Sequence, residues 1–280
     1  MKWLRRLGIF CGVVYLLIAG LLYFKQEALL FHPRARNADY SYGNYPEEWL
    51  ALPDGTRLHA LHLRSAAQKG VILYFHGNVG DNGRSLYQVG GLRELGYDLY
   101  LVDYPGFGKS EGATDRTDDL TTNFQTVYDR LLTEYPEDRI IVLGYSLGTG
   151  PASYLAARNQ PRATVLVAPY TSLAAMKDRW FWMFPDFLLK YDVDNARNLS
   201  RARGPVYVLH GTADELIPVA MGRELAALGD NIKLVELPNV GHRGAILSRQ
   251  VPEVVRYVAK GDFSASPPAP LPGRGEQIMD

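Results

Sequence analysis

The stretch from residue 139 to residue 159 constrains the fold of this chain more than any other. It reads RIIVLGYSLGTGPASYLAARN. The apolar run Ile140–Leu143 is typical of a strand buried on both faces. The segment after Gly148 has the Ala and Leu content of a helix. A buried strand, a tight turn around Ser146 and a helix therefore follow one another, which favours an α/β fold.

Gly144-Tyr145-Ser146-Leu147-Gly148 is a Gly-x-Ser-x-Gly pattern in the context of a nucleophile elbow. A serine at the tip of so sharp a turn leaves no room for side chains two positions before or after it. The following helix points the positive end of its dipole at the serine. An ordinary glycine-rich turn is the alternative, because the pattern is short. We expect Ser146 to be a nucleophile if the chain also supplies a base, an acid and oxyanion donors.

The rest of the chain alternates apolar strands with segments of helical periodicity. This predicts a mostly parallel, doubly wound sheet with helices on both faces, opened by an antiparallel pair. In that pair we expect His59 and His62 to face solvent. The strands are predicted at Glu47–Leu52, Arg57–Leu63, Val71–Phe75, Tyr97–Val102, Ile140–Leu143, Ala163–Ala168, Pro205–Leu209 and Ile232–Leu237, and helices at Ser85–Leu95, Thr117–Tyr135 and Gln250–Ala259.

A long excursion, Pro169–Gly204, separates two of the predicted strands. It is too apolar and too long for a plain connection. We interpret it as a small helical cap over the active site, with Trp180, Trp182 and Phe184 as candidates for contacts with a substrate. The alternative is a pair of ordinary crossover helices packed on the sheet.

The N-terminus contains an uncharged, mostly apolar run, Leu7–Phe24. Its 18 residues reach the threshold for a membrane-spanning helix and exceed the core of a signal peptide, which has about 7–15. Lys2, Arg5 and Arg6 precede it, so the positive-inside rule places the N-terminus in the cytoplasm and the rest of the chain on the non-cytoplasmic side (periplasmic, extracellular or lumenal). A buried core helix and cleavage near Ile18 are the alternatives.

These features divide the chain into an N-terminal anchor over residues 1–25, an α/β domain over 26–260 and a Pro-rich tail over 261–280. We expect the tail to be disordered. Thirty Lys and Arg residues balance thirty Asp and Glu residues, so no basic field indicates a nucleic acid as a partner. The single cysteine, Cys11, excludes an internal disulfide.

A serine nucleophile needs a base, and histidine is the usual one near neutral pH. His76 and His210 each end a buried strand before a glycine, which is typical of structural turn residues. His242 lies between the last strand and the last helix, at the sheet edge that carries Ser146. We therefore expect His242 to be the base.

The acid should follow a strand at the same edge and precede the histidine in the chain. Asp214 follows Pro205–Leu209 and would orient the imidazole and stabilise the imidazolium. The backbone N–H groups of Leu147 and Asn78 are expected to form the oxyanion hole, with Val79 as the alternative to Asn78. Asp103 is interpreted as a structural residue that ties its own loop. No metal or organic cofactor is needed for this chemistry.

Five segments appear in a familiar order: Phe75-His76-Gly77-Asn78, Val102–Ser110, Gly144–Gly148, His210–Asp214 and Gly241-His242. Together they resemble the α/β-hydrolase superfamily, especially the serine-aminopeptidase-like, membrane-anchored α/β-hydrolase-domain proteins, over about Gln26–Lys260. The resemblance implies the α/β-hydrolase fold, serine hydrolase chemistry and the triad Ser146, Asp214 and His242. Pro105 departs from the pattern, because many relatives have Arg there.

We therefore expect a membrane-anchored serine hydrolase that cleaves an acyl ester or thioester of a small-molecule or lipid-like substrate. A peptidase that releases N-terminal residues is the nearest alternative. It would need an anion to receive the free amine, for which Asp178, Asp186 and Asp192 are candidates. A membrane-tethered scaffold without catalysis is a third hypothesis.

Overall fold

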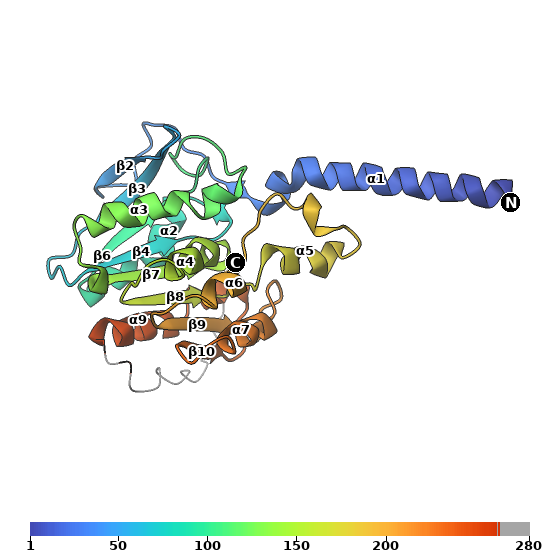
Figure 1. The fold of residues 1–280 in the computed structure, drawn as a ribbon. Helices are drawn as coiled ribbons and strands as arrows, with labels where there is room; N and C mark the ends of the chain where they lie inside the picture. The colour runs from blue at the N-terminus through green and yellow to red at the C-terminus, as the bar shows by residue number, and fades with distance from the viewer. Residues whose placement is uncertain (262, 264–280) are drawn as a thin grey trace.

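A computed structural model describes residues 1–261 and Phe263 of the chain (Figure 1). The tail predicted for residues 261–280 lies almost entirely outside these described residues. Within them, a mixed sheet flanked by helices forms the body of the molecule, and one long helix projects from it (Figure 1).

The main sheet has eight strands in the order β10-β9-β8-β7-β4-β6-β3-β2. The strands from β10 to β6 are mutually parallel, whereas β3 pairs antiparallel with both β6 and β2. This confirms the predicted fold class. The strands are β2 (Glu47–Ala51), β3 (Arg57–Leu63), β4 (Val71–Phe75), β6 (Asp98–Val102), β7 (Ile140–Tyr145), β8 (Ala163–Val167), β9 (Val206–Gly211) and β10 (Ile232–Leu237).

Helices cover both faces of this sheet, so each strand contributes to two apolar cores. In β4, Val71, Leu73 and Phe75 face one core, and Ile72 and Tyr74 face the other. The first core includes side chains of α3, α4 and α7, and the second includes side chains of α2, η1 and α9. These helices are α2 (Asn82–Val89), η1 (Gly90–Leu95), α3 (Asn123–Leu132), α4 (Thr149–Ala156), α7 (Val219–Ala226) and α9 (Gln250–Lys260), with short 3-10 helices η2 (Thr117–Leu120) and η3 (Glu137–Arg139) between strands.

The prediction that His59 and His62 face solvent is wrong. Both side chains are fully buried. The two residues are three positions apart in a strand, so they point to opposite faces of the sheet, and both faces are covered. Nε2 of His59 lies 2.9 Å from a carboxylate oxygen of Glu47, and Nδ1 of His62 lies 2.8 Å from one of Glu48.

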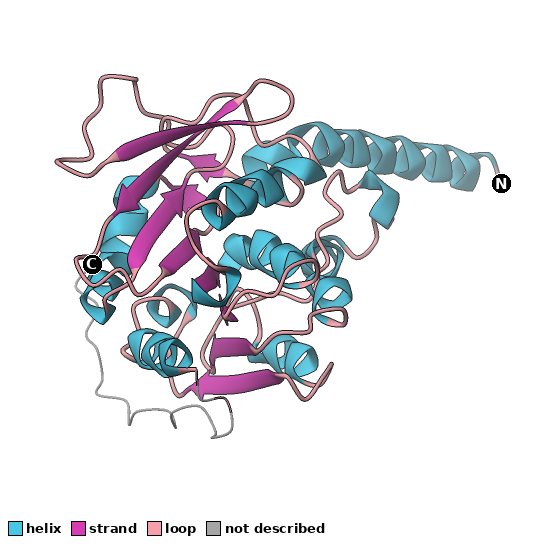
Figure 2. Ribbon diagram, turned by 60° about the vertical axis from the view of Figure 1, so that its left-hand side comes forward, coloured by secondary structure: helices cyan, strands magenta, loops and turns pink. Residues whose placement is uncertain are grey.

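The N-terminal helix α1 runs without a break from Lys2 to Leu30. It extends past the boundary expected at Lys25. Among the described residues it is the one helix long and apolar enough to cross a membrane by length and composition. Figures 1 and 2 show that its N-terminal half stands clear of the body, whereas its C-terminal half lies beside the segment between β8 and β9.

The segment between β8 and β9 has two parts. Helix α6 (Asn195–Leu199) packs on α4, as a crossover helix would. Nδ2 of Asn195 donates to Oγ1 of Thr149 at 2.9 Å and anchors this part. Helix α5 (Leu173–Phe181) instead extends from the body on the same side as α1 (Figure 1), and the 3-10 helix η5 (Asp186–Leu188) contacts α1. We call residues 172–190 the cap from here on.

Candidate active site

Ser146 lies at the turn between β7 and the 3-10 helix η4 (Ser146–Gly148), which leads into α4. Its φ is +53°, a conformation that few residues other than glycine adopt and that stores strain. A Cβ at Gly144 would lie 2.4 Å from the carbonyl oxygen of Gly148, and one at Gly148 would lie 2.1 Å from that of Phe75. The turn is therefore closed to side chains on either side of the serine.

His242 begins the short helix α8 (His242–Ala245) and contacts both other residues of the predicted triad. Its Nε2 lies 2.9 Å from Oγ of Ser146, and its Nδ1 lies 2.8 Å from Oδ2 of Asp214. An ionised carboxylate only accepts hydrogen bonds, so Nδ1 carries the proton. Nε2 is then free to accept the proton of the serine hydroxyl, as a general base must.

The loop after β9 holds Asp214 in place. Its Oδ1 accepts hydrogen bonds from the backbone N–H groups of Leu216 at 3.0 Å and Ile217 at 2.8 Å. Burial by itself would raise the pKa of Asp214, but hydrogen bonds from His210, His242 and Ile217 outweigh it and lower the pKa below the ordinary aspartate value. The carboxylate is thus ionised at neutral pH beside His242.

His210 is a neighbour of this carboxylate, although its place before a glycine at the end of a strand is typical of a structural turn residue. Its Nε2 donates to the carbonyl oxygen of Ile217 at 2.8 Å and lies 3.5 Å from Oδ2 of Asp214. The fully buried imidazole therefore supports the loop from below. The sequence could have predicted this contact, because His210 ends a parallel strand and the last residues of such a strand lie beside the loop that follows it.

The two residues expected to supply the oxyanion donors, Leu147 and Asn78, line the same cavity as Ser146. Leu147 is in the first turn of η4, where backbone N–H groups have no acceptor within the helix. Asn78 precedes β5 (Val79–Gly80), which pairs with β1 (His32–Pro33). The N–H of His32 donates to the carbonyl of Asn78 at 2.8 Å, and Nδ2 of Asn78 donates to the carbonyl of Leu30 at 2.8 Å. The end of α1 thereby holds the Asn78 loop.

A cavity of about 370 Å³ has Ser146, Leu147 and Asn78 in its lining. Of the three cap residues proposed for substrate contacts, Trp180 and Phe184 line it, whereas Trp182 does not and is 75% exposed. The wall contributed by the segment after β8, the cap and the Asp214 loop is mainly apolar: Tyr170, Leu173, Met176, Lys177, Trp180, Phe181, Phe184, Leu188, Leu189, Leu216 and Ile217.

The remaining wall of this cavity belongs to α1, a role that the sequence did not predict. Leu22, Gln26, Leu29 and Leu30 line it. Nε2 of Gln26 donates to the carbonyl of Leu188 at 3.0 Å, which joins the helix to the cap. The sequence feature that could have indicated this contact is Gln26, a polar residue just beyond the uncharged run. A glutamine that is buried there needs polar partners from another part of the chain.

The cap offers little to receive a free amine. Asp178, Asp186 and Asp192 are exposed side chains, and none of them lines the cavity. Asp178 and Asp186 pair with Lys177, and Asp192 pairs with Arg197. Among the described residues that line the cavity, Lys177 is the one charged side chain.

Asp103 ties its loop through its backbone, because its carbonyl accepts a hydrogen bond of 2.9 Å from Oγ of Ser110. Its carboxylate is fully buried, 3.4 Å from Nε2 of His76 and 3.8 Å from Nδ1 of His59. Glu215 contacts the backbone N–H of His242 at 3.4 Å and not the imidazole ring. Neither residue takes the place of Asp214.

The model of the family "Serine aminopeptidase, S33" matches residues 66–197. Human alpha/beta hydrolase domain-containing protein 17B is 32% identical over 179 residues, which cover 61% of this chain and 59% of that protein. The match includes the elbow and the loops that follow β4 and β6. The chain belongs to the α/β-hydrolase superfamily.

Other relatives of this α/β-hydrolase agree with the assignment. Lysophosphatidylserine lipase ABHD12 of Macaca fascicularis is 30% identical over 186 residues, which cover 58% of this chain and 46% of that protein. The chain thus spans less than two thirds of the length of these curated relatives.

Solved structures share the fold. The Pyrococcus furiosus esterase Pf2001 superposes with a TM-score of 0.66 and 17% identity, over 82% of this chain and 98% of that one. The thioesterase domain from the curacin biosynthetic pathway superposes with a TM-score of 0.56 and 16% identity, over 78% and 100%.

Proposed function

We propose that this chain is a membrane-anchored serine hydrolase that cleaves an acyl ester or thioester through an acyl-enzyme on Ser146. The observation that carries the proposal is the unbroken series of contacts from Ser146 through His242 to Asp214, beside an apolar cavity. A serine hydroxyl, an imidazole with a free Nε2 and a buried carboxylate in this order are what acyl transfer requires.

In the acylation step, Oγ of Ser146 attacks the carbonyl carbon while Nε2 of His242 takes the hydroxyl proton. Asp214 stabilises the imidazolium that forms and does not itself become protonated. The N–H groups of Leu147 and Asn78 donate to the negatively charged oxygen of the tetrahedral intermediate. The intermediate collapses, and the leaving alcohol or thiol receives the proton from His242.

Deacylation repeats the sequence with water in place of the serine. His242 removes a proton from the water as it attacks the acyl carbonyl, and then returns a proton to Oγ of Ser146. The product is a free carboxylic acid. The same two N–H groups serve both tetrahedral intermediates, so one oxyanion site suffices.

The lining of the cavity supports an acyl substrate over a peptide with a free N-terminus. Its walls are leucine and aromatic side chains, and its charged residue, Lys177, has the wrong sign to receive an ammonium group. Among the relatives, the names lipase, esterase and thioesterase point the same way. Turnover of p-nitrophenyl esters compared with aminoacyl-anilides separates the two activities, and we expect only the esters to be cleaved.

A fluorophosphonate probe tests the reaction class directly. We expect the purified protein to be labelled, Ser146→Ala to be unlabelled, and Ser200→Ala, on an exposed serine after α6, to be labelled as the unaltered protein is. A properly folded protein that takes up no probe would instead be a scaffold without catalysis.

The placement in a membrane is part of the proposal. Helix α1 supplies an apolar helix of sufficient length, and Lys2, Arg5 and Arg6 at its start favour a cytoplasmic N-terminus. The catalytic domain then lies on the non-cytoplasmic side. A reporter enzyme fused after Asp280 should be active outside the cytoplasm, and a cytoplasmic signal would contradict this orientation.

A further inference from the structure

The outer end of the cap carries large apolar side chains that are exposed at the surface. We call Trp180, Phe181, Trp182, Met183 and Phe187 the cap tip. Their side chains are 38–81% exposed, and Phe187 is the most exposed of them. An exposed cluster of this kind marks a surface for another protein or a membrane.

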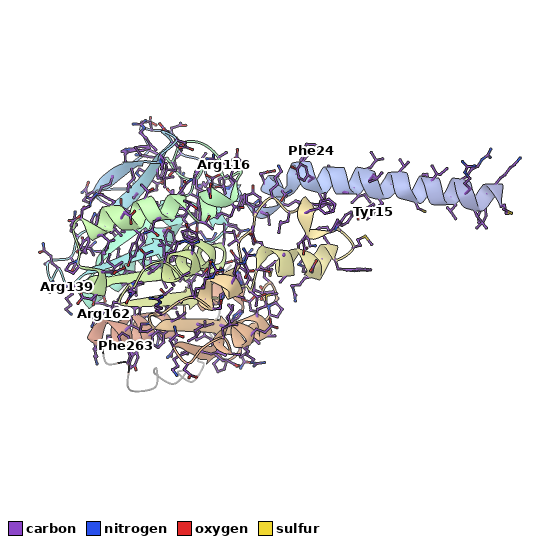
Figure 3. All side chains as sticks on the ribbon, in the orientation of Figure 1. Tyr15, Phe24, Arg116, Arg139, Arg162 and Phe263 are labelled. Carbon is purple, nitrogen blue, oxygen red and sulfur yellow. The ribbon has the colours of Figure 1, made fainter. Side chains whose placement is uncertain are left out.

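The cap tip is held against the apolar part of α1. The ring of Tyr15 stacks on Phe184 with centroids 5.0 Å apart and planes within 10°. The Tyr15 hydroxyl donates to the carbonyl of Met183 at 3.1 Å. Figure 3 shows Tyr15 on the side of α1 that faces the cap and Phe24 on the opposite side. The cap therefore follows α1 from Gln26 to Tyr15.

The length of α1 sets the depth of this contact. At 1.5 Å per residue, a hydrocarbon layer of about 30 Å takes up about 20 residues. With Arg6 at one boundary, the other falls near Gln26. Tyr15 then lies about 16 Å inside that boundary, and a helix tilt of 40° reduces the depth only to about 13 Å. Any side chain packed on Tyr15 therefore lies inside the hydrocarbon layer, close to its midplane.

We propose that the cap tip is embedded in the same bilayer leaflet as the C-terminal half of α1. The cavity beside Ser146 then receives the acyl chain of a single-chain membrane lipid ester directly from that leaflet. The assignment of the ester rests on the proposed function, whereas the insertion of the cap does not. The cavity has walls from both α1 and the cap, so its two sides are the two elements that contact lipid.

The size of the cavity and the charges of the cap agree with this placement. A cavity of about 370 Å³ is at the small end of ligand pockets, which hold about 300–1,000 Å³, and suits one acyl chain. Lys177 pairs with Asp178 and Asp186, which lowers the cost of placing these three charges in the membrane. The guanidinium of Arg179 lies 5.9 Å from the centre of the Trp180 ring, and a side chain of this length can extend toward the membrane surface.

Continuity with α1 favours lipid over a second copy of this chain as the occupant. Residues of α1 near the tip, such as Leu16 and Leu17, are themselves exposed and apolar. The tip and α1 thus form one surface, and a bilayer that surrounds the helix covers both.

Tryptophan fluorescence tests the insertion. The chain has four tryptophans, so the variant Trp3→Phe/Trp49→Phe reports on Trp180 and Trp182 alone. Reconstituted at full length in phosphatidylcholine vesicles, it should be quenched by bromine atoms on the lipid acyl chains and shielded from iodide in the water. A control that keeps only Trp49, on the edge strand β2, should show the reverse.

Two outcomes would overturn the insertion. If iodide quenches the fluorescence of the cap tip and brominated lipid does not, the tip lies in water. Fluorescence that depends on the protein-to-lipid ratio and ignores brominated lipid would assign the surface to a second copy of the chain.

A charge on the tip tests the delivery of substrate. Phe187 is 81% exposed and lies outside the cavity lining, and Tyr87 on α2 is a matched control at 76%. We expect Phe187→Glu to lower hydrolysis of a monoacyl lipid ester in vesicles about tenfold or more while p-nitrophenyl acetate is cleaved at the unaltered rate. Tyr87→Glu should affect neither substrate.

Equal rates of Phe187→Glu and the unaltered protein on vesicles would overturn delivery from the leaflet. Failure of the proposed function has a different signature, in which the unaltered protein cleaves neither substrate and takes up no fluorophosphonate. The quenching experiment would still decide the position of the cap tip in that case.

Discussion

The backbone N–H of Lys190 donates a hydrogen bond of 2.9 Å to Oε1 of Gln26, across 164 positions of the chain. The amide of Gln26 is buried and also donates to the carbonyl of Leu188, so both ends of this side chain are used. The pair of bonds closes the cavity on the side of α1. Because of it, the helix expected to be a mere anchor becomes part of the candidate active site.

We expect Gln26→Leu to loosen the cap. The substitution leaves the N–H of Lys190 without its partner in a part-buried site, at a cost of about 1–3 kcal/mol. Hydrogen exchange of the amides in residues 182–190 should accelerate, with a smaller change in the sheet. Gln160→Leu, on an exposed glutamine, is the control. Unchanged exchange in the cap would show that the bonds do not hold it closed.

The wall formed by α1 predicts a change in chain-length preference. Leu22 lines the cavity, whereas its neighbour Leu21 does not and is exposed. Leu22→Trp should lower kcat/KM for long p-nitrophenyl esters about tenfold relative to the acetate, because the larger ring fills space that an acyl chain would occupy. Leu21→Trp should leave the ratio of kcat/KM for long esters to that for the acetate unchanged. Equal ratios for the two variants would show that α1 does not line the acyl-binding pocket.

Removal of the charge at residue 214 should abolish most activity. In Asp214→Asn the side-chain amide can donate to Nδ1 of His242, which would move the imidazole proton to Nε2. A protonated Nε2 can no longer accept the proton of Ser146. A loss in kcat of about 10⁴ is typical of this change in a serine triad. Steady-state kinetics with a p-nitrophenyl ester measures it, with Asp192→Asn as the exposed control. A loss below about tenfold would mean that another group orients His242.

The same carboxylate predicts a pH dependence of stability. The pKa of Asp214 is lower in the folded protein than the ordinary value of about 3.9. The unfolded chain therefore binds the proton more readily, so the group adds stability above about pH 4 and loses it as the pH falls through the folded-state pKa. In denaturant unfolding between pH 2 and pH 6, the free energy of unfolding should fall less steeply toward acid pH in Asp214→Asn than in the unaltered protein. Parallel declines in the two proteins would contradict a lowered pKa of Asp214.

The elbow should not tolerate a side chain at Gly148. A Cβ there would lie 2.1 Å from the backbone oxygen of Phe75, which a rigid central strand cannot move. We expect Gly148→Ala to cost at least about 1–3 kcal/mol and to prevent fluorophosphonate labelling. Gly90→Ala is the matched control, because its φ is −54° and its Cβ would meet nothing within 4 Å. Normal labelling of Gly148→Ala would contradict the geometry of the turn.

The sequence alone was sufficient for the parallel sheet and for the order of Ser146, Asp214 and His242 along it. These features depend on local signals: runs of branched apolar residues, glycines at a sharp turn and polar residues that follow strands. Parallel strands place their carboxyl ends at one edge, so the sheet converts order in the chain into proximity in space. The geometry of the elbow depends on the same local spacing of glycines.

The burial of His59 and His62 is a feature that local reasoning could have predicted correctly. His59 and His62 are three positions apart, so a strand cannot turn both toward a single solvent face. Their partners Glu47, Glu48 and Tyr135 come from other elements, and satisfying two imidazoles in the interior depends on all of them.

Only the tertiary structure decided the role of α1. The helix is apolar on all sides, so its sequence does not indicate which face packs on the cap. That distinction depends on Tyr15, Gln26 and Leu30 meeting residues far away in the chain. The sequence by itself determined the fold and predicted which residues would react. The packing of α1 on the cap decided the shape of the space above Ser146, because contacts between distant segments exist only once the chain has folded.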